Sequence, residues 1–333
     1  MMEMPAEDQL HSLNTDSGYR QHFMNLDHWR PYVDYVCQRD NLSATPHVRI
    51  GQVGTYPTFI IDDRWILKFF GRNFAGDTSY QAEFEVNQLL TDVGQVPAPT
   101  LHQSGLLFPD STDWPWPYLL IDFVAGTSIG EVYNDVTFED KLAMAQWIGQ
   151  VCKTLHHLPL TATSLTFTIR NAYYRLVKEQ YEKVVAHHQT SGILPTHLVD
   201  QLETYLLPLE QLLAPSSMTR LIHADLTADH IMGQFSNEHW QPQHLIDFGD
   251  AMVGDFHYEL IALHLDLFKA NKTLLQAYLE SYGLSDDDRQ RLPHRAMSLT
   301  LLHRFDVLEG LPELGIHLTE FATLKDLETR LWG

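Results

Sequence analysis

The spacing of apolar residues becomes mainly helical after Gly126 in this chain of 333 residues. Before Gly126, short apolar runs rich in β-branched and aromatic residues alternate with glycines and with a turn at Asp62 and Asp63. The antiparallel strands that this pattern predicts cover residues 47–50, 58–61, 65–70, 100–105 and 118–124. After Gly126, apolar residues recur mainly at helical spacing. The sequence therefore predicts an α+β protein with a strand-rich first lobe and a mainly helical second lobe.

Three parts of the chain are expected on this basis. Residues 1–22 are polar and unpatterned, which predicts a flexible N-terminal extension. Residues 23–124 would form the strand-rich lobe and residues 125–333 the helical lobe. Thr137, with Asp140 three residues later, is typical of a helix start. Helices are expected at residues 26–39, 79–91, 137–155, 171–187 and 196–213, and over much of 259–331.

Composition indicates which binding partners and which cellular compartment suit this chain. The chain has 43 acidic and 22 basic residues, a formal charge of -21, which disfavours nucleic acid and suits a cationic small molecule. Cys37 and Cys152 are the only cysteines, and their spacing indicates neither a disulfide framework nor a zinc site. The sequence shows no signal-peptide pattern and no apolar run of about 18 residues. We therefore expect a cytoplasmic protein without a membrane partner, either a monomer or a homodimer.

Two segments of the helical half contain aspartates that follow apolar residues. Residues 221–233 read LIHADLTADHIMG, and residues 244–255 read HLIDFGDAMVGD. Asp225 lies in a polar loop, while Asp247 directly follows a short run that resembles a buried strand. Phosphoryl transfer requires one carboxylate to orient or deprotonate the attacking hydroxyl, and others to hold the cations that neutralise a triphosphate. We assign the first role to Asp225 and the second to Asp247.

These two segments resemble the catalytic and metal-binding loops of the aminoglycoside phosphotransferase family, whose members are relatives of protein kinases. The family pattern is H-G-D-x-x-x-x-N, followed by I-D-[WF/L]-[GE] and then G-D. The matching positions here are His223, Asp225, Asp247, Phe248, Gly249, Gly254 and Asp255. Ala224 occupies the usual glycine position, and His230 occupies that of the metal-binding asparagine. The resemblance implies a bilobal protein-kinase-like fold that transfers a phosphoryl group from ATP or GTP.

The residue at position 230 is the main departure from the family pattern. A neutral imidazole suits zinc or manganese better than magnesium, which prefers oxygen ligands. Asp229 could supply such an oxygen instead, so the expected metal ligands are Asp247 with His230 or Asp229, and the expected cation is Mg²⁺ or Mn²⁺. Asp225 and His223 are the candidate catalytic residues. We expect His223 to hold the loop by hydrogen bonds more than to transfer a proton.

The first half contains candidates for the nucleotide site in the order that a kinase-like fold requires. The hairpin with Gly51, Gly54 and Thr55 would let backbone N–H groups approach phosphates. Lys68 lies in the apolar run WILKFF, where a charge needs a partner. Glu83 shares a helical face with apolar residues and is the favoured partner, with Glu85 as the competing choice.

The resemblance also implies where the purine would bind. Residues 119–123 would form the hinge strand whose backbone hydrogen-bonds the base, with Asp122, Phe123 and Val124 nearest to it. The strand-rich lobe would then be the nucleotide-binding lobe, and the helical lobe would contain the catalytic loop, the metal loop and the acceptor site.

Three other functions remain open on the sequence alone. Residues 126–130, GTSIG, match a serine-hydrolase elbow around Ser128, although residues 131–135 look more like a loop than a helix. His223, Asp225, Asp229 and His230 could instead be a metallohydrolase cluster. The substitution at position 230 also leaves a nucleotide-binding pseudokinase or regulatory module open.

The acceptor is expected to be a small molecule. HADLTADH and DFGDA look most like the hygromycin phosphotransferase branch of the family, which implies an aminoglycoside and, with it, antibiotic resistance. Amino alcohols, nucleosides and other sugars are alternatives. Acidic residues that could bind a cationic acceptor include Asp250, Asp266 and the run 286–288.

Overall fold

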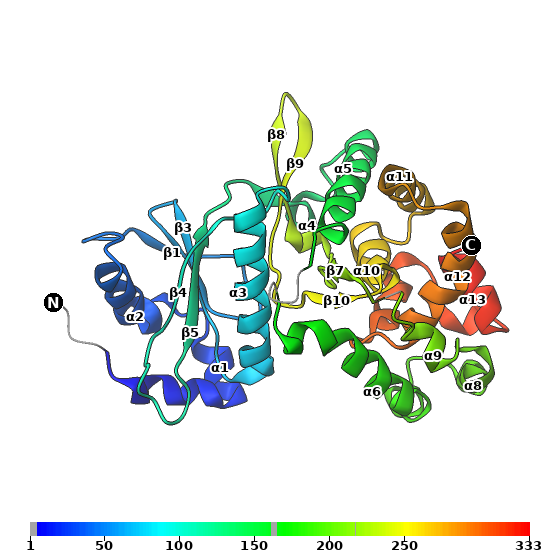
Figure 1. Cartoon of the computed structure of the whole chain (residues 1–333), viewed down its shortest axis with the longest axis horizontal. Coiled ribbons are helices and arrows are strands. Elements are labelled where there is room, and N and C mark those ends of the chain that lie inside the picture. The colour runs from blue at the N-terminus through cyan, green and yellow to red at the C-terminus, as the bar shows by residue number, and fades with distance from the viewer. Residues whose placement is uncertain (1–4, 161–164, 217) are drawn as a thin grey trace. The chain divides into compact units, whose positions relative to one another are not determined.

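The computed structural model describes residues 5–160, 165–216 and 218–333, and divides the chain into two compact units (Figure 1). The first unit, called here the sheet unit, comprises Met1–Gly94, Ala98–Ala125 and Ile246–Gly249. The second, called here the helical unit, comprises Gln95–Pro97, Gly126–Leu245 and Asp250–Gly333. The short segment around Asp247 therefore belongs to the sheet unit, although its neighbours in sequence belong to the helical unit.

An antiparallel sheet of five strands, in the order β1-β2-β3-β5-β4, forms the centre of the sheet unit. The strands are β1 (Val48–Ile50), β2 (Thr58–Ile61), β3 (Trp65–Phe69), β4 (Leu101–Leu106) and β5 (Pro117–Asp122). Each begins and ends within two residues of its predicted position, because the apolar runs and turns mark the strands clearly. Central β3 pairs with both β2 and β5, and Lys68 lies opposite Leu119 of β5.

Helices cover both faces of this sheet. On one face, α2 (Leu26–Arg39) buries Trp29, Val33 and Val36 against inward residues of the sheet such as Phe59 and Phe69. On the other face, α3 (Gly76–Val93) packs Tyr80 and Phe84 against a second apolar cluster that includes Phe70, Leu119 and Ile121. Successive residues of a strand point to opposite faces of the sheet. The side chains of β3 are therefore divided between the two apolar cores.

The N-terminal segment, expected to be flexible up to residue 22, contains two helical elements in its described part. These are η1 (Glu7–Asn14) and α1 (Asp16–His22). Leu10, Leu13 and Tyr19 are buried in the same core as Trp29. These few apolar residues are scattered through a polar segment, so no sequence periodicity indicated that the segment packs.

The helical unit combines helices with short strands. The helices and helical turns are α4 (Ile129–Val132), α5 (Phe138–His156), α6 (Phe167–Ser191), α7 (Thr196–Val199), α8 (Leu202–Tyr205), α9 (Leu209–Leu212), η3 (Ala228–His230), α10 (Phe256–Ala262), η4 (Leu263–Leu267), α11 (Lys272–Tyr282), α12 (Asp286–Leu301), η5 (Val307–Leu314), η6 (Leu318–Glu320) and α13 (Leu324–Leu331). The strands are β6 (Thr127–Ser128), β7 (Arg220–Ile222), β8 (Ile231–Ser236), β9 (His239–Leu245) and β10 (Met252–Gly254).

Local sequence explains where several of these helices begin and end. Thr137 caps α5 by accepting a hydrogen bond from the Asp140 N–H at 3.1 Å, which confirms the predicted helix start. The single helix expected over residues 196–213 is instead three short helices. Pro208 is one cause of this division, because proline cannot donate a helical hydrogen bond and restricts the residue before it.

Glycine controls the closest helix packing in this unit. A Cβ on Gly149 of α5 would lie 2.6 Å from the backbone oxygen of Tyr278 on α11, so a larger residue would push the two helices apart.

The α+β prediction is confirmed, with an antiparallel sheet in one unit and mainly helices in the other.

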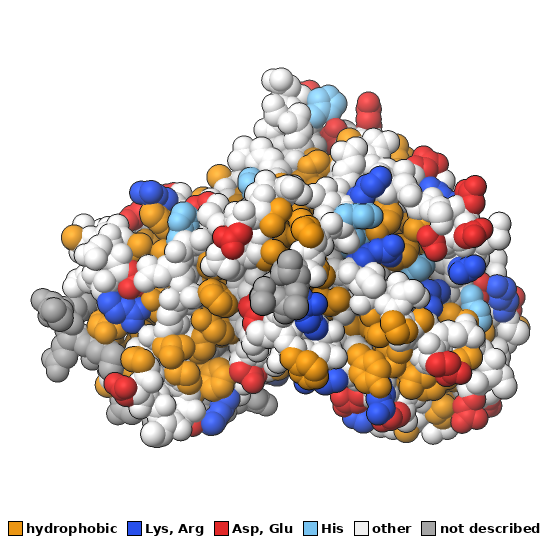
Figure 2. Space-filling view, viewed as in Figure 1, with side chains coloured by type: hydrophobic (Ala, Val, Ile, Leu, Met, Phe, Trp, Pro, Cys, Tyr) orange, Lys and Arg blue, Asp and Glu red, His pale blue; other side chains and the backbone are white. Residues whose placement is uncertain are grey.

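Surface properties of the described residues fit a globular protein. Among those residues, no helix combines the length and the apolar character needed to cross a bilayer. The face shown in Figure 2 carries acidic and basic side chains interspersed with apolar ones. On this face, the excess of acidic residues is therefore dispersed and does not form one continuous patch.

Candidate active site

Lys68 of β3 makes two ion pairs inside the sheet unit. Its Nζ lies 2.7 Å from Oε2 of Glu83 on α3 and 3.1 Å from Oδ1 of Asp247. Lys68 and Glu83 are buried, whereas the Asp247 side chain is 39% exposed. Burial alone would lower the pKa of the Lys68 ammonium, but the carboxylates of Asp247 and Glu83 raise it. Lys68 therefore stays charged at neutral pH.

The position of Lys68 in a central strand explains these contacts. Its neighbours in sequence, Leu67 and Phe69, point into the core beneath α2. Lys68 points to the opposite face, toward α3, and so reaches Glu83. The predicted contact between Lys68 and Glu83 is confirmed. The competing residue, Glu85, instead accepts a hydrogen bond from Gln81 at 3.1 Å.

Asp247 and Gly249 form the tight loop that the sequence predicted to bind a metal. Asp247 has φ of 62° and accepts a hydrogen bond from the Gly249 N–H at 3.4 Å. A left-handed conformation is uncommon outside glycine but is tolerated better by aspartate than by most residues. Because Asp247 is partly exposed, its carboxylate can accept a cation while one oxygen contacts Lys68.

The predicted hinge residues lie at the end of β5, which ends at Asp122. The N–H groups of Asp122 and Phe123 bond the carbonyl oxygens of Thr100 and Arg64 at 3.0 and 2.9 Å. Of the three predicted hinge residues, Val124 is the one whose N–H has no hydrogen bond within the described part of the chain. If a base binds here through a backbone donor, Val124 is the residue that would provide it.

The Asp122 side chain contacts His102 and is 44% exposed. Its Oδ1 lies 2.6 Å from His102 Nε2. Burial would raise the pKa of the Asp122 carboxyl, but hydrogen bonds from His102 and Thr100 lower it.

The predicted phosphate-covering hairpin joins β1 and β2. The Gly51 N–H bonds the Thr58 carbonyl at 2.8 Å, and a Cβ on Gly51 would lie 2.9 Å from the Thr58 side chain. A Cβ on Gly54 would have no atom within 4 Å, so the backbone there borders open space. Thr55, the third predicted residue of this hairpin, accepts a hydrogen bond at its carbonyl from the hydroxyl of Tyr19.

In the helical unit, the loop after β7 contains His223 and Asp225. Glu259 of α10 accepts hydrogen bonds from the backbone N–H groups of His223 and Ala224, the latter at 3.1 Å. His223 is fully buried, and its Nδ1 lies 3.3 Å from the Asp225 N–H. These bonds support the predicted scaffold role of His223. They also fix the loop around Asp225, whose side chain is 22% exposed.

Glu259 is itself held by a buried histidine. His156 of α5 has Nε2 2.9 Å from Glu259 Oε1 and Nδ1 3.0 Å from the Tyr282 hydroxyl. Burial would raise the pKa of the Glu259 carboxyl, but His156 lowers it, with further lowering from His223. The contribution of His156, 103 positions earlier, had no signal in the sequence.

The two alternative metal ligands at the end of this loop differ in orientation. His230 Nδ1 lies 2.6 Å from the Asp225 backbone carbonyl, and since a carbonyl can only accept, Nδ1 carries the proton. In the neutral ring, Nε2 is then the acceptor nitrogen. Asp229 is exposed and its carboxylate lies toward α4, because a Cβ on Gly130 would meet its Oδ1. His230 is thus bonded to the loop of Asp225.

The donor atoms of Asp247 and His230 fit different cations. The Asp247 carboxylate provides the oxygen that Mg²⁺ prefers, and His230 Nε2 provides a nitrogen more suited to Mn²⁺ or Zn²⁺. Across the described residues, no group of three or more His, Cys, Asp or Glu is arranged to bind a metal within the protein alone.

The same findings bear on the hydrolase alternatives. Ser128 is buried and caps α4 by accepting a hydrogen bond from the Glu131 N–H at 3.3 Å. Its hydroxyl therefore has a structural role in the helix that follows it. The metallohydrolase alternative lacks the required ligand cluster among the described residues.

Two acidic residues expected to face a cationic acceptor already have partners. Asp250 forms an ion pair with Arg304, and the Asp266 Oδ1 accepts a hydrogen bond from the Ala228 N–H at 2.7 Å. Asp266 also lies 3.4 Å from Lys269 Nζ. Arg304 was not singled out from the sequence, because nothing in its local pattern distinguishes it from a solvated surface arginine.

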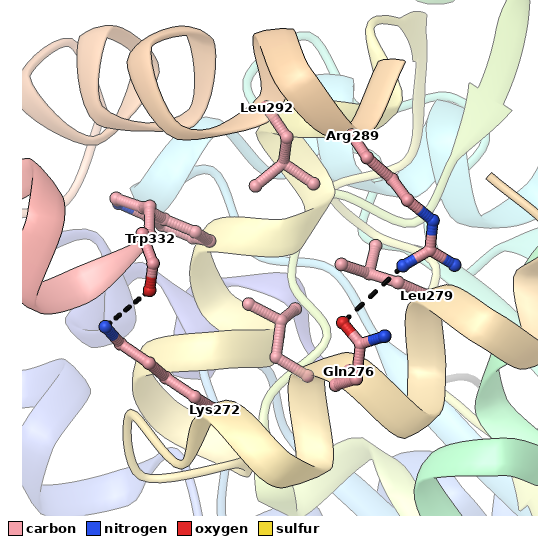
Figure 3. Close-up of a pocket in the computed structure, with 8 residues that line it drawn as sticks. Lys272, Gln276, Leu279, Arg289, Leu292 and Trp332 are labelled. Atoms are coloured by element: carbon pink, nitrogen blue, oxygen red, sulfur yellow. Dashed lines mark hydrogen bonds between the residues drawn. The ribbon is translucent and has the colours of Figure 1, made fainter. Parts of the chain in front are cut away.

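A pocket of about 340 Å³ lies elsewhere in the helical unit, among α11, α12 and the residues after α13 (Figure 3). It is lined by Lys272, Leu275, Gln276, Leu279, Arg289, Leu292, Trp332 and Gly333. No predicted site residue lines this pocket, so it does not contribute to the candidate site.

Solved structures with the same fold include two small-molecule kinases. The GDP and kanamycin complex of the aminoglycoside phosphotransferase APH(2'')-IIIa is 21% identical, with a TM-score of 0.61 over 90% of this chain and 97% of that one. A microcompartment-associated aminopropanol kinase is 15% identical, with a TM-score of 0.56 over 90% and 98%. The predicted kinase-like fold is therefore confirmed.

Two further comparisons concern the sequence. Lysine-specific demethylase JMJ21 of Arabidopsis thaliana is 22% identical over 270 residues, which are 66% of this chain and 29% of that protein. The chain thus spans less than a third of that relative's length. The family model described as the phosphotransferase enzyme family matches residues 52–294. Because this match covers more than half of the chain, the protein belongs to the phosphotransferase enzyme family.

Proposed function

We propose that this protein transfers the γ-phosphoryl group of ATP or GTP to a hydroxyl group of a small molecule. The observation that carries the proposal is the buried lysine of the sheet unit, Lys68, held by Glu83 and Asp247 at 2.7 and 3.1 Å. A charged ammonium fixed beside a partly exposed carboxylate can bind phosphate oxygens while the carboxylate holds a cation.

Each candidate residue has a distinct task in this reaction. Lys68 would bind the α- and β-phosphates, and the hairpin with Gly51, Gly54 and Thr55 would cover them. Asp247 would hold Mg²⁺ or Mn²⁺, with His230 as a nitrogen ligand. Asp225 would orient the acceptor hydroxyl or accept its proton. The cation, when bound, would offset the charge of the phosphates.

For the acceptor, an aminoglycoside such as hygromycin or a related amino sugar is the first class to test. Family membership and the charge of -21 support a cationic acceptor. The partners of Asp250 and Asp266 favour a second candidate, an amino alcohol, since a single ammonium needs fewer free carboxylates than a polycationic sugar. The aminopropanol kinase with the same fold gives that class a precedent.

The site of action would be the cytoplasm, where ATP is available. Cys37 and Cys152 are both buried and unpaired, which agrees with a reducing compartment. If the acceptor is an aminoglycoside, expression of the protein in a susceptible bacterium should raise the concentration of that drug needed to stop growth.

The decisive experiment separates an enzyme from a nucleotide-binding pseudokinase. The purified protein is incubated with ATP or GTP, Mg²⁺ or Mn²⁺, and a panel of aminoglycosides, sugars and amino alcohols, and products are identified by a mass increase of one phosphoryl group. We expect Asp225→Ala to lower kcat by at least about 100-fold while ADP affinity changes little, because Asp225 acts on the acceptor. Nucleotide binding without turnover on any acceptor would support the pseudokinase alternative. Full activity in Asp225→Ala would refute the role of Asp225.

A further inference from the structure

Tyr19 connects the N-terminal segment to the predicted phosphate-covering hairpin. Its side chain is buried, and its hydroxyl donates a hydrogen bond to the backbone carbonyl of Thr55. Tyr19 belongs to α1, which precedes the part of the chain that matches the family model, residues 52–294. Tyr19 therefore lies outside the part of the chain that matches the family model, whereas Thr55 lies within it.

The local sequence fixes α1 where Tyr19 can make this contact. Thr15 caps α1 by accepting a hydrogen bond from the Gly18 N–H at 3.2 Å. A Cβ on Gly18 would lie 2.0 Å from the Ser12 carbonyl oxygen, so glycine is required for the turn from η1 into α1. Leu13 is buried in the sheet-unit core, and its carbonyl accepts a hydrogen bond from Asn73 at 2.8 Å.

Aromatic contacts hold the Tyr19 ring itself. The ring stacks on Phe23 with centroids 5.1 Å apart and meets the edge of Phe74 at 5.3 Å. Phe74 in turn provides a backbone carbonyl for the hydroxyl of Tyr56, at 2.7 Å. Tyr19 and Tyr56 thus brace the end of the hairpin that leads into β2. The ring contacts do not involve the hydroxyl, so they would persist if only the hydroxyl were removed.

The hydroxyl also lies within the electrostatic field of the nucleotide-site lysine. Burial raises the pKa of the Tyr19 hydroxyl, with a further contribution from Tyr56, while Lys68 lowers it. The Lys68 Nζ lies 5.8 Å from the centroid of the Tyr56 ring. The same few residues therefore link α1, the hairpin and the lysine predicted to bind phosphates.

We propose that Tyr19 is a positioning residue for the nucleotide, because its bond to the Thr55 carbonyl orders the hairpin 51–56 before the nucleotide arrives. The proposal rests on the proposed function, in which this hairpin covers the phosphates. Glycine-containing hairpins lose much conformational freedom when they close on a ligand. A hairpin that is already held loses less, so it binds more tightly without a new contact to the ligand.

Tyr19→Phe is the direct test, because it removes the hydroxyl and keeps the ring contacts. Tyr32→Phe is the matched control, since the buried Tyr32 of α2 also donates to a backbone carbonyl, that of Ala6 at 2.8 Å, but does not contact the hairpin through that bond. Nucleotide affinity is measured by calorimetry with ADP and the divalent cation. Hydrogen exchange of a peptide covering residues 51–56 is measured in the protein without nucleotide.

We expect Tyr19→Phe to weaken ADP binding by about 3- to 10-fold, the effect of losing one net hydrogen bond. Exchange in residues 51–56 should become faster, KM for the nucleotide should rise, and kcat at saturating nucleotide should change little. Tyr32→Phe should leave ADP affinity and hairpin exchange as in the wild-type chain.

The outcomes distinguish this proposal from the proposed function. Wild-type affinity and unchanged hairpin exchange in Tyr19→Phe would overturn the role of Tyr19, even if the protein is an active kinase. Equal effects of Tyr19→Phe and Tyr32→Phe would also overturn it, because they would indicate a general loss of packing. A wild-type chain that binds neither ADP nor GDP would overturn the proposed function, and the role of Tyr19 with it.

Discussion

Two residues of the candidate loops, Ala224 and Asp247, adopt backbone conformations that favour glycine. Their φ angles are 66° and 62°. The family pattern places glycine at the position of Ala224, and the observed φ gives the physical reason, since glycine has no Cβ to clash in this region. Alanine retains the turn here at a cost of about 1 kcal/mol. The substitution in the motif therefore leaves the geometry of the loop intact.

Replacement of His230 by asparagine tests its proposed role as a metal ligand. His230 Nδ1 is bonded to the Asp225 carbonyl, so in the neutral ring Nε2 is the nitrogen that could ligate a metal. An asparagine can keep the bond to the carbonyl through its amide N–H and present an oxygen in place of nitrogen. We expect His230→Asn to lower Mn²⁺ affinity relative to Mg²⁺ several-fold, measured by electron paramagnetic resonance of Mn²⁺ in the presence of ADP, and to shift the ratio of activities with the two cations in the same direction.

The chain offers a matched control for this variant. His157, exposed at the end of α5, also bonds a backbone carbonyl through Nδ1, that of Lys153 at 2.7 Å. His157→Asn should leave both the cation preference and the activity ratio unchanged. If His230→Asn also leaves the cation preference unchanged, His230 is not a metal ligand and its role is limited to the loop.

Sequence reasoning succeeded for residues whose local context is itself unusual. Lys68 is a charged residue within an apolar strand, and Glu83 lies on the inward face of a helix. Because each charge needs a partner of opposite sign in the core, the sequence predicted that the two form an ion pair. Tyr19 and His156 have ordinary contexts, and their partners lie 36 and 103 positions away. Contacts of that kind depend on the folded arrangement, which no local pattern encodes.

At the scale of elements, α10 connects the two loops of the helical unit. Asp255, the N-cap residue of α10, accepts a hydrogen bond from the His257 N–H at 3.0 Å and pairs with Arg295 of α12. Four residues later, Glu259 holds the backbone of the catalytic loop. The strands β7 and β10 pair with each other. The helix α10 thus fixes both the end of β10 and the loop after β7.

The buried Asp255 carboxylate at the start of α10, with its partners His257 and Arg295, should make the free energy of unfolding depend on pH in the acid range. Burial would raise the pKa of the Asp255 carboxyl, but His257 and Arg295 lower it from 3.8 to about 2. Because the folded pKa lies below the unfolded one, Asp255 stabilises the fold above about pH 4, and this contribution is lost as the pH falls toward 2. The difference corresponds to about 2 kcal/mol of unfolding free energy.

Asp255→Asn tests this dependence, since asparagine can still cap the helix but cannot titrate. Urea unfolding at a series of pH values should give a variant that is less stable at pH 7 and whose stability falls less steeply below pH 4 than that of the wild type. Asp287→Asn, at an exposed position in the first turn of α12, is the control for loss of one carboxylate. If the unfolding free energies of the wild type and of Asp255→Asn fall in parallel as the pH is lowered, the contribution assigned to the ionised Asp255 carboxylate is wrong.

At the scale of the whole molecule, the sequence predicted the two-part architecture better than the boundaries between the parts. The strands were found because turns and apolar runs define them locally. Residues 246–249, however, belong to the sheet unit although they lie within the helical half of the sequence. A segment of four residues is too short to have a periodicity of its own. Its packing is decided by Lys68, which binds Asp247 from 179 positions away.

Deletion of the N-terminal segment would test whether it is part of the sheet unit or an extension of it. Leu10, Leu13 and Tyr19 are buried in the core that contains Trp29, and full burial of such side chains contributes about 1.5–3 kcal/mol each. A chain that begins at residue 23 should therefore lose several kcal/mol of stability in the sheet unit only. The helical unit has its own buried residues, which the deletion leaves in place.

Limited proteolysis followed by mass spectrometry would measure the two units separately in the same sample. We expect cleavage within residues 48–122 to become faster in the deleted chain, while cleavage within residues 220–331 keeps its wild-type rate. Leu13→Ala should reproduce part of the effect in the full chain, because it removes one buried side chain and leaves the Tyr19 hydroxyl in place. If the deleted chain resists proteolysis in residues 48–122 as well as the wild type does, the segment is a dispensable extension, and its burial stabilises the segment itself and not the sheet on which it packs.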